Sequence, residues 1–427
     1  MLPSADDMHL DIERHALDNG LQIVLQPDTT LPLVAVNLWY HVGSKNEQPS
    51  TTGLAHLFEH MLFQGSANVG VNDHFRLVQQ AGGTANGSTW FDRTNYYETL
   101  PAHFLDLALW LESDRMGFLL PALDLEKLEN QRSVVMNERR QRVDNQPYGR
   151  ALERLNEILY SDHHPYHWPV IGYMDDIAGA TLDDVRVFFS TYYPPNNAVL
   201  TLAGDFEPQR ALERIDHFFG SISTGDPIPP IAEPRKEGPS TQREVMEDAV
   251  ELSRLYLATV VPPFGDQDWY KADLLTTALS AGKTSPLYRD LVYTRQIATD
   301  VSAFVLPTEL AATFLVVATA KPGVDVQELE KVIDDHLAET AISGPTAQDL
   351  DRAQNKVITA LSDQFQKLDD RADLLSMFTT YFDDPKRVFS EAEIYSQIDG
   401  EDLANFAQRH LNQDDRVALT VVPKQRS

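Results

Sequence analysis

The sequence predicts an α+β protein made of two similar domains, each an antiparallel-rich sheet with helices packed on it. Three observations lead to this prediction. The chain has 427 residues, which is more than one hydrophobic core usually serves. A proline-rich segment lies near its middle. The same order of strand-like and helix-like patterns occurs before and after that segment, which indicates an internal repeat.

The first half starts with strand patterns and continues mainly with helices. Residues 17–25 combine a turn signal with an alternating strand, and residues 33–42 are a second β-rich run. A short helix is expected at 50–63. After it, residues 81–97 predict a glycine turn followed by two short strands rich in threonine and aromatic residues. Three helices, an apolar strand and a last short helix complete this half, at 105–119, 123–143, 151–160, 198–203 and 208–219.

Residues 223–245 are expected to link the two halves, because five prolines between 224 and 240 restrict the backbone there. The predicted domains are therefore residues 1–222 and residues 246–427. In the second half, the strand pattern at 254–261 matches that at 33–42, and the helix at 273–281 matches that at 50–63. Later matches keep the same order and pair 312–337 with 94–116, 350–381 with 125–160, and 403–422 with 182–203.

Composition excludes several classes of partner. The net charge of −29 repels phosphate backbones and anionic lipids, so neither nucleic acid nor a membrane is an expected partner. The sequence contains no cysteine, so any metal must be held by histidine and carboxylate groups. No apolar run approaches the ~20 residues of a membrane span, and no signal peptide is recognisable; cytoplasm and periplasm both remain possible. The charged run at 112–115 is expected to form ion pairs on a helix surface.

The helix at 50–63 carries the chemistry of the first half. Leu57 and Phe58 lie on its apolar stripe, whereas His56, Glu59 and His60 lie on the opposite face. Two histidines four residues apart can reach one tetrahedral zinc ion, and Glu59 lies where a carboxylate can accept a proton from an attacking water. A merely polar helix surface is the alternative. The glutamate and the apolar opposite face favour zinc, and one ion per chain is expected because the matching helix of the second half has no histidine.

Beyond this helix, the sequence resembles the pitrilysin/insulysin family of zinc peptidases, the inverzincins, along essentially its whole length. His56-x-x-Glu59-His60 has the family's inverted zinc motif. Further matching segments follow in order, namely Gly43-Ser, Gly82-Gly-Thr-Ala-Asn, Thr89-Trp-Phe-Asp-Arg-Thr-Asn-Tyr-Tyr, Trp110-Leu-Glu-Ser-Asp-Arg-Met, Val134-Val-Met-Asn-Glu138, His164-Pro-Tyr and Tyr193-Pro-Pro-Asn-Asn-Ala. The chain is most similar to the short two-domain branch that includes mitochondrial processing peptidase.

The resemblance implies that Glu138 is the third zinc ligand. The residues alone leave this open, since Glu126 and Glu129 lie on the same predicted helix and Glu138 is also placed to pair with Arg142. The Val-Val-x-x-Glu context favours Glu138. Gln131 replaces a glutamate that the family often has two turns before the ligand. It can hydrogen-bond but adds no charge, so we expect weaker support of the site from this position.

The resemblance also implies hydrolysis of unfolded peptides. The substrate is expected to add as a strand along residues 85–90, where Asn86 and Thr89 match the family's substrate-binding strand. An ordinary covered sheet edge is the alternative.

Active family members commonly carry an arginine and, seven residues later, a tyrosine that bind substrate and stabilise the oxyanion. Alignment places Val292 and Thr299 at these positions, and only a shifted register would bring in Arg289, Tyr293 or Arg295. The family forms clamshells of two such chains around a chamber. The missing pair favours a heterodimer with a homologous subunit that lacks zinc. A homodimer is the second possibility, and a non-catalytic structural or assembly subunit is the third.

Overall fold

The computed structural model describes residues 11–231 and 241–424, which form two compact units. Of the described residues, unit 1 holds those within 1–139, 168–232 and 362–390, and unit 2 holds those within 140–167, 233–361 and 391–427. The units therefore differ from the sequential domains 1–222 and 246–427 expected from the linker, because each half contributes one segment to the other unit. None of the described helices has the length and apolar character needed to cross a membrane.

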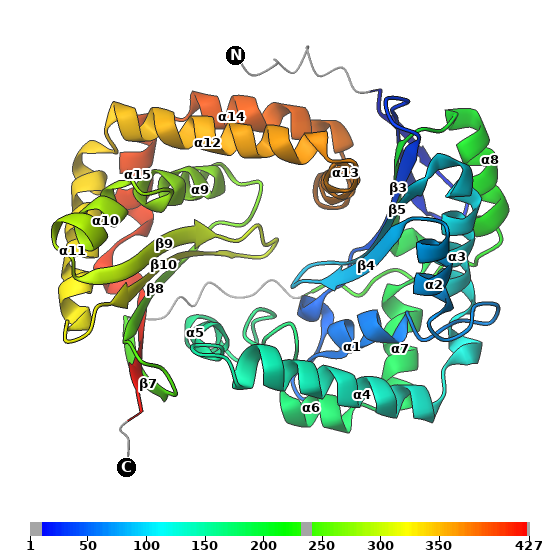
Figure 1. The fold of residues 1–427 in the computed structure, drawn as a ribbon, viewed down its shortest axis with the longest axis horizontal. Helices are drawn as coiled ribbons and strands as arrows, with labels where there is room; N and C mark the ends of the chain where they lie inside the picture. Colours follow the sequence, from blue (N-terminus) through cyan, green and yellow to red (C-terminus); the bar gives the residue numbers. More distant parts are fainter. Residues whose placement is uncertain (1–10, 232–240, 425–427) are drawn as a thin grey trace. The chain divides into compact units, whose positions relative to one another are not determined.

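Unit 1 contains a six-stranded sheet in the order β1-β2-β6-β3-β5-β4. Neighbouring strands are antiparallel except β2 and β6, which are parallel. The strands are β1 (Glu13–Ala16), β2 (Gln22–Pro27), β3 (Leu33–Tyr40), β4 (Thr84–Thr89), β5 (Thr94–Pro101) and β6 (Ala198–Gly204). The central strands β3 and β6 are rich in β-branched and apolar residues and are buried almost throughout. The edge strand β4 lies beside α1 (Leu54–Met61), as Figure 1 shows.

Helices cover both faces of this sheet (Figure 1). On one side lie α3 (Leu105–Phe118) and α8 (Pro208–Phe219), and on the other lies α13 (Leu368–Phe382). Arg371 of α13 donates hydrogen bonds of 2.8 Å to Gln26 and to Asp28. The other helices of unit 1 are α2 (Asp73–Gln80), α4 (Leu125–Arg139), α6 (Met174–Gly179) and α7 (Leu182–Tyr192).

Unit 2 repeats this topology with a five-stranded sheet in the order β7-β11-β8-β10-β9. The one parallel pair, β7 with β11, occupies the place of β2 with β6, which confirms the predicted repeat. Its strands are β7 (Gln242–Asp248), β8 (Arg254–Val261), β9 (Ala298–Val305), β10 (Ala312–Ala320) and β11 (Val417–Pro423). Its helices are α5 (Ala151–Leu159), α9 (Gln267–Ser280), α10 (Pro286–Tyr288), α11 (Val326–Ser343), α14 (Glu391–Gln397) and α15 (Gly400–His410), while α12 (Ala347–Gln366) starts in unit 2 and ends in unit 1.

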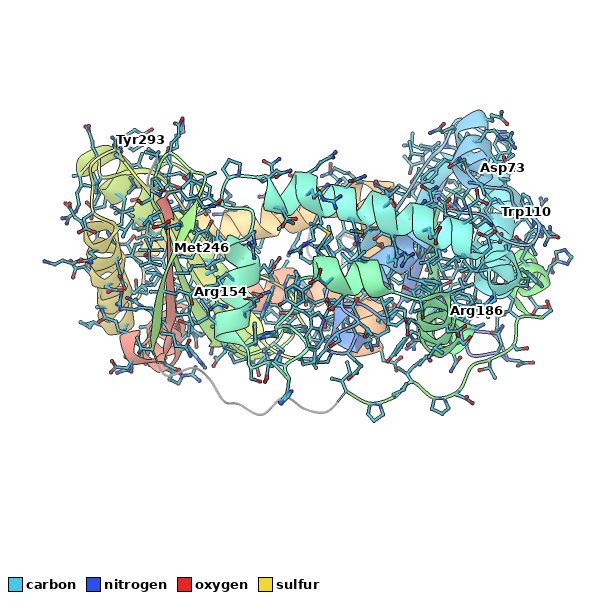
Figure 2. The ribbon with its side chains drawn as sticks, turned by 90° about the horizontal axis from the view of Figure 1, so that it is seen from below. Asp73, Trp110, Arg154, Arg186, Met246 and Tyr293 are labelled. Carbon is cyan, nitrogen blue, oxygen red and sulfur yellow. The ribbon has the colours of Figure 1, made fainter. Side chains whose placement is uncertain are left out.

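Helices α5 and α13 correspond to each other in the repeat, and each packs on the sheet of the other half. Arg154 of α5 binds Glu244 of β7 through two bonds of 2.7 Å, and Figure 2 shows Arg154 close to Met246 of the same strand. In unit 1, Ser376 of α13 donates to Thr201 of β6 at 2.8 Å. We call this arrangement the reciprocal helix exchange.

The expected surface ion pairs at 112–115 are instead buried. Glu112 and Arg115 are 0% and 2% exposed, and they form an ion pair with each other. The Arg115 guanidinium lies 4.2 Å from the ring centroid of Tyr96, so an aromatic face replaces part of its hydration. The spacing correctly pairs Glu112 with Arg115, but spacing alone does not tell whether that side of a helix faces solvent or protein.

Candidate metal centre

Helix α1 is fixed in place by its apolar side. Leu57, Phe58 and Met61 are at most 1% exposed, and the Phe58 ring lies 4.5 Å from that of Tyr193. The helix begins after Gly53, whose φ of +85° and close approach to the Ile171 carbonyl leave no room for a Cβ. The opposite side of the helix therefore presents His56, Glu59 and His60 in fixed positions.

Glu47 holds the first turn of α1, a role that the sequence analysis missed. Its two carboxylate oxygens accept the backbone N–H groups of Gly53 and Ala55, each at 2.8 Å. Burial raises the pKa of Glu47 well above its usual range, while these two bonds and a bond from Trp168 act in the opposite direction. Glu47 lies six residues before Gly53, outside the usual capping position, so no local sequence signal reveals it.

The structure brings His56, His60 and Glu138 together. Nε2 of His60 lies 3.3 Å and Nε2 of His56 lies 3.9 Å from the same Glu138 oxygen. One ligand atom from each residue falls within 4.8 Å of the others. Ligands about 2.0–2.1 Å from a tetrahedral zinc ion lie about 3.3 Å apart, so these residues fit zinc in number, type and spacing. The sequence alternatives Glu126 and Glu129 do not join this group.

A second group of potential ligands, His74, Glu98 and Glu112, is fully buried in unit 1. The Arg115 guanidinium already supplies the cation here, because it pairs with Glu112 and lies 3.3 Å from Nε2 of His74. Burial lowers the pKa of His74 to about 3, so its imidazole is neutral. This group is therefore a neutralised polar core and not a metal site.

Glu59 is held by the edge strand β4. The hydroxyl of Thr89 donates a 2.6 Å hydrogen bond to Oε2 of Glu59. Burial raises the pKa of Glu59, whereas the Thr89 hydrogen bond and the nearby His60 and Arg93 side chains act against that increase. A carboxylate whose pKa lies above its ordinary value is better suited to return a proton after it has accepted one.

Strand β4 leaves space for Glu59 through a glycine. A Cβ at Gly87 would lie 3.2 Å from Cγ of Glu59, 3.2 Å from the Phe63 ring and 3.2 Å from the Tyr96 ring. Asn86, by contrast, pairs with Tyr97 across the strands and lies on the opposite face. The two predicted substrate residues, Asn86 and Thr89, thus lie on different faces of β4, and Thr89 contacts the predicted base.

The remaining predicted residues lie on α4 and in unit 2. Gln131 is buried on α4, two turns before Glu138. Val292 packs against the core of unit 2, and the Thr299 hydroxyl bonds the Thr319 carbonyl at 3.2 Å. Tyr293, the alternative tyrosine, is 54% exposed and projects from the surface of unit 2 (Figure 2).

Comparison with known proteins gives matches over both halves of the chain. Residues 22–167 match the model of insulinase (peptidase family M16), and residues 179–357 match that of the peptidase M16 inactive domain. A zinc protease of Helicobacter pylori, PqqE, is 33% identical over 86% of this chain and 83% of its own length. A probable mitochondrial-processing peptidase subunit beta of Arabidopsis thaliana is 25% identical over 49% of this chain and 38% of its own.

A solved structure agrees with these sequence matches. The crystal structure of a protease from Helicobacter pylori superimposes with a TM-score of 0.91 at 30% identity, covering 97% of this chain and all of that one. The fold, the order of the matched segments and the identity to a zinc protease over most of both chains agree with the resemblance of the motifs. The chain belongs to the insulinase family of peptidases, peptidase family M16.

Proposed function

We propose that this chain is a zinc-dependent endopeptidase that hydrolyses unfolded peptides, with His56, His60 and Glu138 as its zinc ligands. The observation that carries the proposal is the convergence of these three side chains beside Glu59. Three protein ligands would leave one position of a tetrahedral zinc ion to water or substrate, which is typical of catalytic zinc sites and not of structural ones. Relatives named zinc proteases support the choice of metal.

Bound zinc supplies Lewis acidity, which polarises a peptide carbonyl and allows water to attack it near neutral pH. The role proposed for Glu59 is to remove a proton from the attacking water and then to give it to the leaving amine. Thr89 keeps the Glu59 carboxylate in position through its 2.6 Å hydrogen bond. The buried setting of Glu59 favours the protonated form that the second step requires.

The proposed substrate position is the free edge of β4. This strand ends the sheet of unit 1, and among the described residues no other strand pairs with its outer edge. An extended peptide added there gains main-chain hydrogen bonds and passes beside Thr89 and Glu59. Asn86 and Thr89 would then contact alternate substrate residues, because they lie on different faces of the strand.

We further propose that activity needs a homologous partner subunit without zinc ligands. Val292 and Thr299 supply neither a charge nor a phenol for a developing oxyanion. A partner that carries an arginine and a tyrosine at these positions would complete the site within a clamshell heterodimer. A homodimer that is active without such a partner is the second candidate.

The test is to measure zinc content and hydrolysis of a quenched fluorescent peptide library by the purified chain, with Glu59→Gln as the blank. One zinc per chain with hydrolysis that disappears in Glu59→Gln is the result expected of a self-sufficient enzyme. One zinc per chain without turnover, followed by turnover on addition of a zinc-less homologue, is the result expected of the heterodimer. A chain that binds no zinc would overturn the proposal and leave a structural or assembly role.

A further inference from the structure

A cavity of about 200 Å³ opens on the face of the unit 1 sheet that α13 covers. It is lined only by polar side chains, which makes it different from an ordinary packing defect between a helix and a sheet. Its lining residues include Ser88, Asn95, Tyr97, Asp369, Asp370 and Asp373. We call this cavity the α13 pocket.

The wall of the α13 pocket is built across three strands. Asn86 pairs with Tyr97, and Tyr97 pairs with Asn37, so these three residues share one face of the sheet. Ser88 of β4 donates to Asn95 at 2.7 Å, and Asn95 donates to Asp373 at 2.8 Å. The pocket therefore extends to β4, the edge strand at which the proposed substrate would add.

Helix α13 gives the pocket its negative charge. Asp373 is a fixed acceptor, since Trp39 donates to it at 2.7 Å and Asn37 at 3.2 Å in addition to Asn95. Asp369 is exposed and, within residues 11–231 and 241–424, has no hydrogen bond or ion pair. Both carboxylates raise the pKa of Tyr97, after the larger effect of burial, which places their charges near its hydroxyl.

Two positive groups lie near these carboxylates and do not neutralise all of them. Arg93 lines the pocket and is held by the Ser88 carbonyl at 2.9 Å and by Asn95 at 3.2 Å. Lys367 lies 3.1 Å from Asp370. Three carboxylates therefore face one guanidinium and one ammonium, and one negative charge remains.

Strand geometry connects this pocket to a bound peptide. Successive side chains of a strand point to opposite faces, so a peptide paired with β4 would alternate between the face of Glu59 and the face of α13. The Glu59 face offers the half-buried aromatic ring of Phe63, whereas the α13 face offers hydroxyl, amide and carboxylate groups. Neighbouring residues of the substrate would thus contact side chains of different chemical character.

We infer that the α13 pocket binds the lysine or arginine side chain of one residue of a peptide substrate. The residues before and after it in the peptide then face the proposed zinc site. The inference rests on the proposed function, because it requires a peptide paired with β4. It gives the enzyme a preference for peptides that combine one basic residue with adjacent apolar residues.

The experiment uses the zinc-loaded Glu59→Gln chain, which binds peptide without turnover, and fluorescence anisotropy of labelled ten-residue peptides. Each peptide is N-acetylated, which excludes binding of its α-amino group, and carries one lysine at a different position of an apolar sequence. A second set replaces lysine by norleucine, which has nearly the same shape and no charge. We expect one lysine position to bind about three- to tenfold more tightly than its norleucine counterpart.

Asp369→Asn in the same background should remove most of this lysine preference and leave norleucine binding unchanged. Asp363→Asn is the matched control, since Asp363 is also exposed in the segment 362–390 but does not line the pocket. Equal binding of lysine and norleucine peptides at every position would overturn the inference. So would an equal effect of both substitutions.

The outcomes separate this inference from the proposed function. Hydrolysis of apolar peptides by the unsubstituted chain, without lysine preference in binding, would overturn the pocket and support the peptidase. Lysine-selective binding without hydrolysis, even with a zinc-less homologue present, would support the pocket and overturn the peptidase. Failure to bind any peptide of either set, with a zinc-less homologue present, would overturn both.

Discussion

The bond between Thr89 and Glu59 joins the edge strand to the proposed base. Replacing Thr89 by valine keeps the shape of the side chain and removes the hydroxyl that donates at 2.6 Å. A hydrogen bond to a carboxylate contributes about 1.5–3 kcal/mol, so we expect kcat to fall about tenfold or more with zinc content unchanged. Steady-state kinetics and metal analysis test this. Thr84→Val, an exposed threonine of the same strand, is the control, and an equal loss of kcat in both variants would contradict the assignment.

Glu98 and Glu112 form a buried pair whose protonation should make stability depend on pH. Burial raises the pKa of each to about 7, against the opposing charge of Arg115. An unfolded glutamate has a pKa near 4.3, so between roughly pH 4.5 and 7 the folded state holds protons that the unfolded state has released. Stability should therefore decrease as pH rises through this window and change little above it.

Glu98→Gln tests this dependence. The substitution removes one buried charge and leaves the Glu112–Arg115 ion pair intact. We expect the loss of thermal stability between pH 5 and pH 8 to become smaller than in the unsubstituted chain. Thermal unfolding at a series of pH values is the measurement, with the exposed Glu213→Gln as control. An unchanged pH profile in Glu98→Gln would show that the pair does not hold an extra proton.

At the scale of an element, helix α1 depends on a residue outside it. Removing the Glu47 carboxylate leaves the N–H groups of Gly53 and Ala55 buried without acceptors, at a cost of about 1–3 kcal/mol each. We expect Glu47→Ala to lower the free energy of unfolding by about 2–4 kcal/mol and to weaken zinc binding, because His56 lies in the first turn.

Urea unfolding and a competition titration with a zinc chelator measure these two effects. Glu207→Ala is a close control, since Glu207 caps α8 with bonds of 3.1 Å and 2.7 Å to Gln209 and Arg210 but is exposed. It should cost little stability and leave zinc affinity unchanged. If both variants bound zinc as tightly as the unsubstituted chain, Glu47 would have only a structural role.

Some features of these elements can be predicted from the local sequence pattern, and others cannot. The apolar stripe of α1 follows from its own residues, as does the strand at Arg254–Val261. The faces on which Asn86 and Thr89 lie do not follow from propensity, since they depend on the register of β4 against β5. Burial of Arg115 depends on the ring of Tyr96, which comes from a different element. The facing of β4 side chains and the burial of Arg115 therefore depend on contacts between residues that are distant in sequence, which local patterns do not predict.

At the scale of the whole molecule, the reciprocal helix exchange escapes prediction for the same reason. The sequences of α5 and α13 show that each needs a partner surface, but not which sheet provides it. Arg371 and Ser376 select the sheet of unit 1 through Asp28 and Thr201, whose side chains lie far away in the sequence. A division of the chain at its linker places α5 with the first half and α13 with the second, whereas the compact units group α5 with unit 2 and α13 with unit 1.

This exchange predicts that the two halves do not fold separately. A fragment of residues 1–231 lacks α13, which buries Ala372, Leu375 and Phe378 in unit 1. We expect this fragment and the fragment 232–427 to be protease-sensitive when expressed alone and to copurify as a resistant pair when expressed together. Size-exclusion chromatography and limited proteolysis would test this. Cooperative unfolding of residues 1–231 alone, with the protease resistance of the full chain, would contradict it.

The same exchange sets a delay during synthesis of the protein. The last strand of the unit 1 sheet, β6, ends at Gly204, whereas α13 ends at Phe382, nearly 180 residues later. At about 5–20 residues per second, a ribosome needs about 10–35 s to make that stretch. During this interval the face of the sheet with Asn37, Asn95 and Thr201 has no α13 to cover it. The nascent chain would thus carry its proposed metal ligands for many seconds before the sheet beside them is closed.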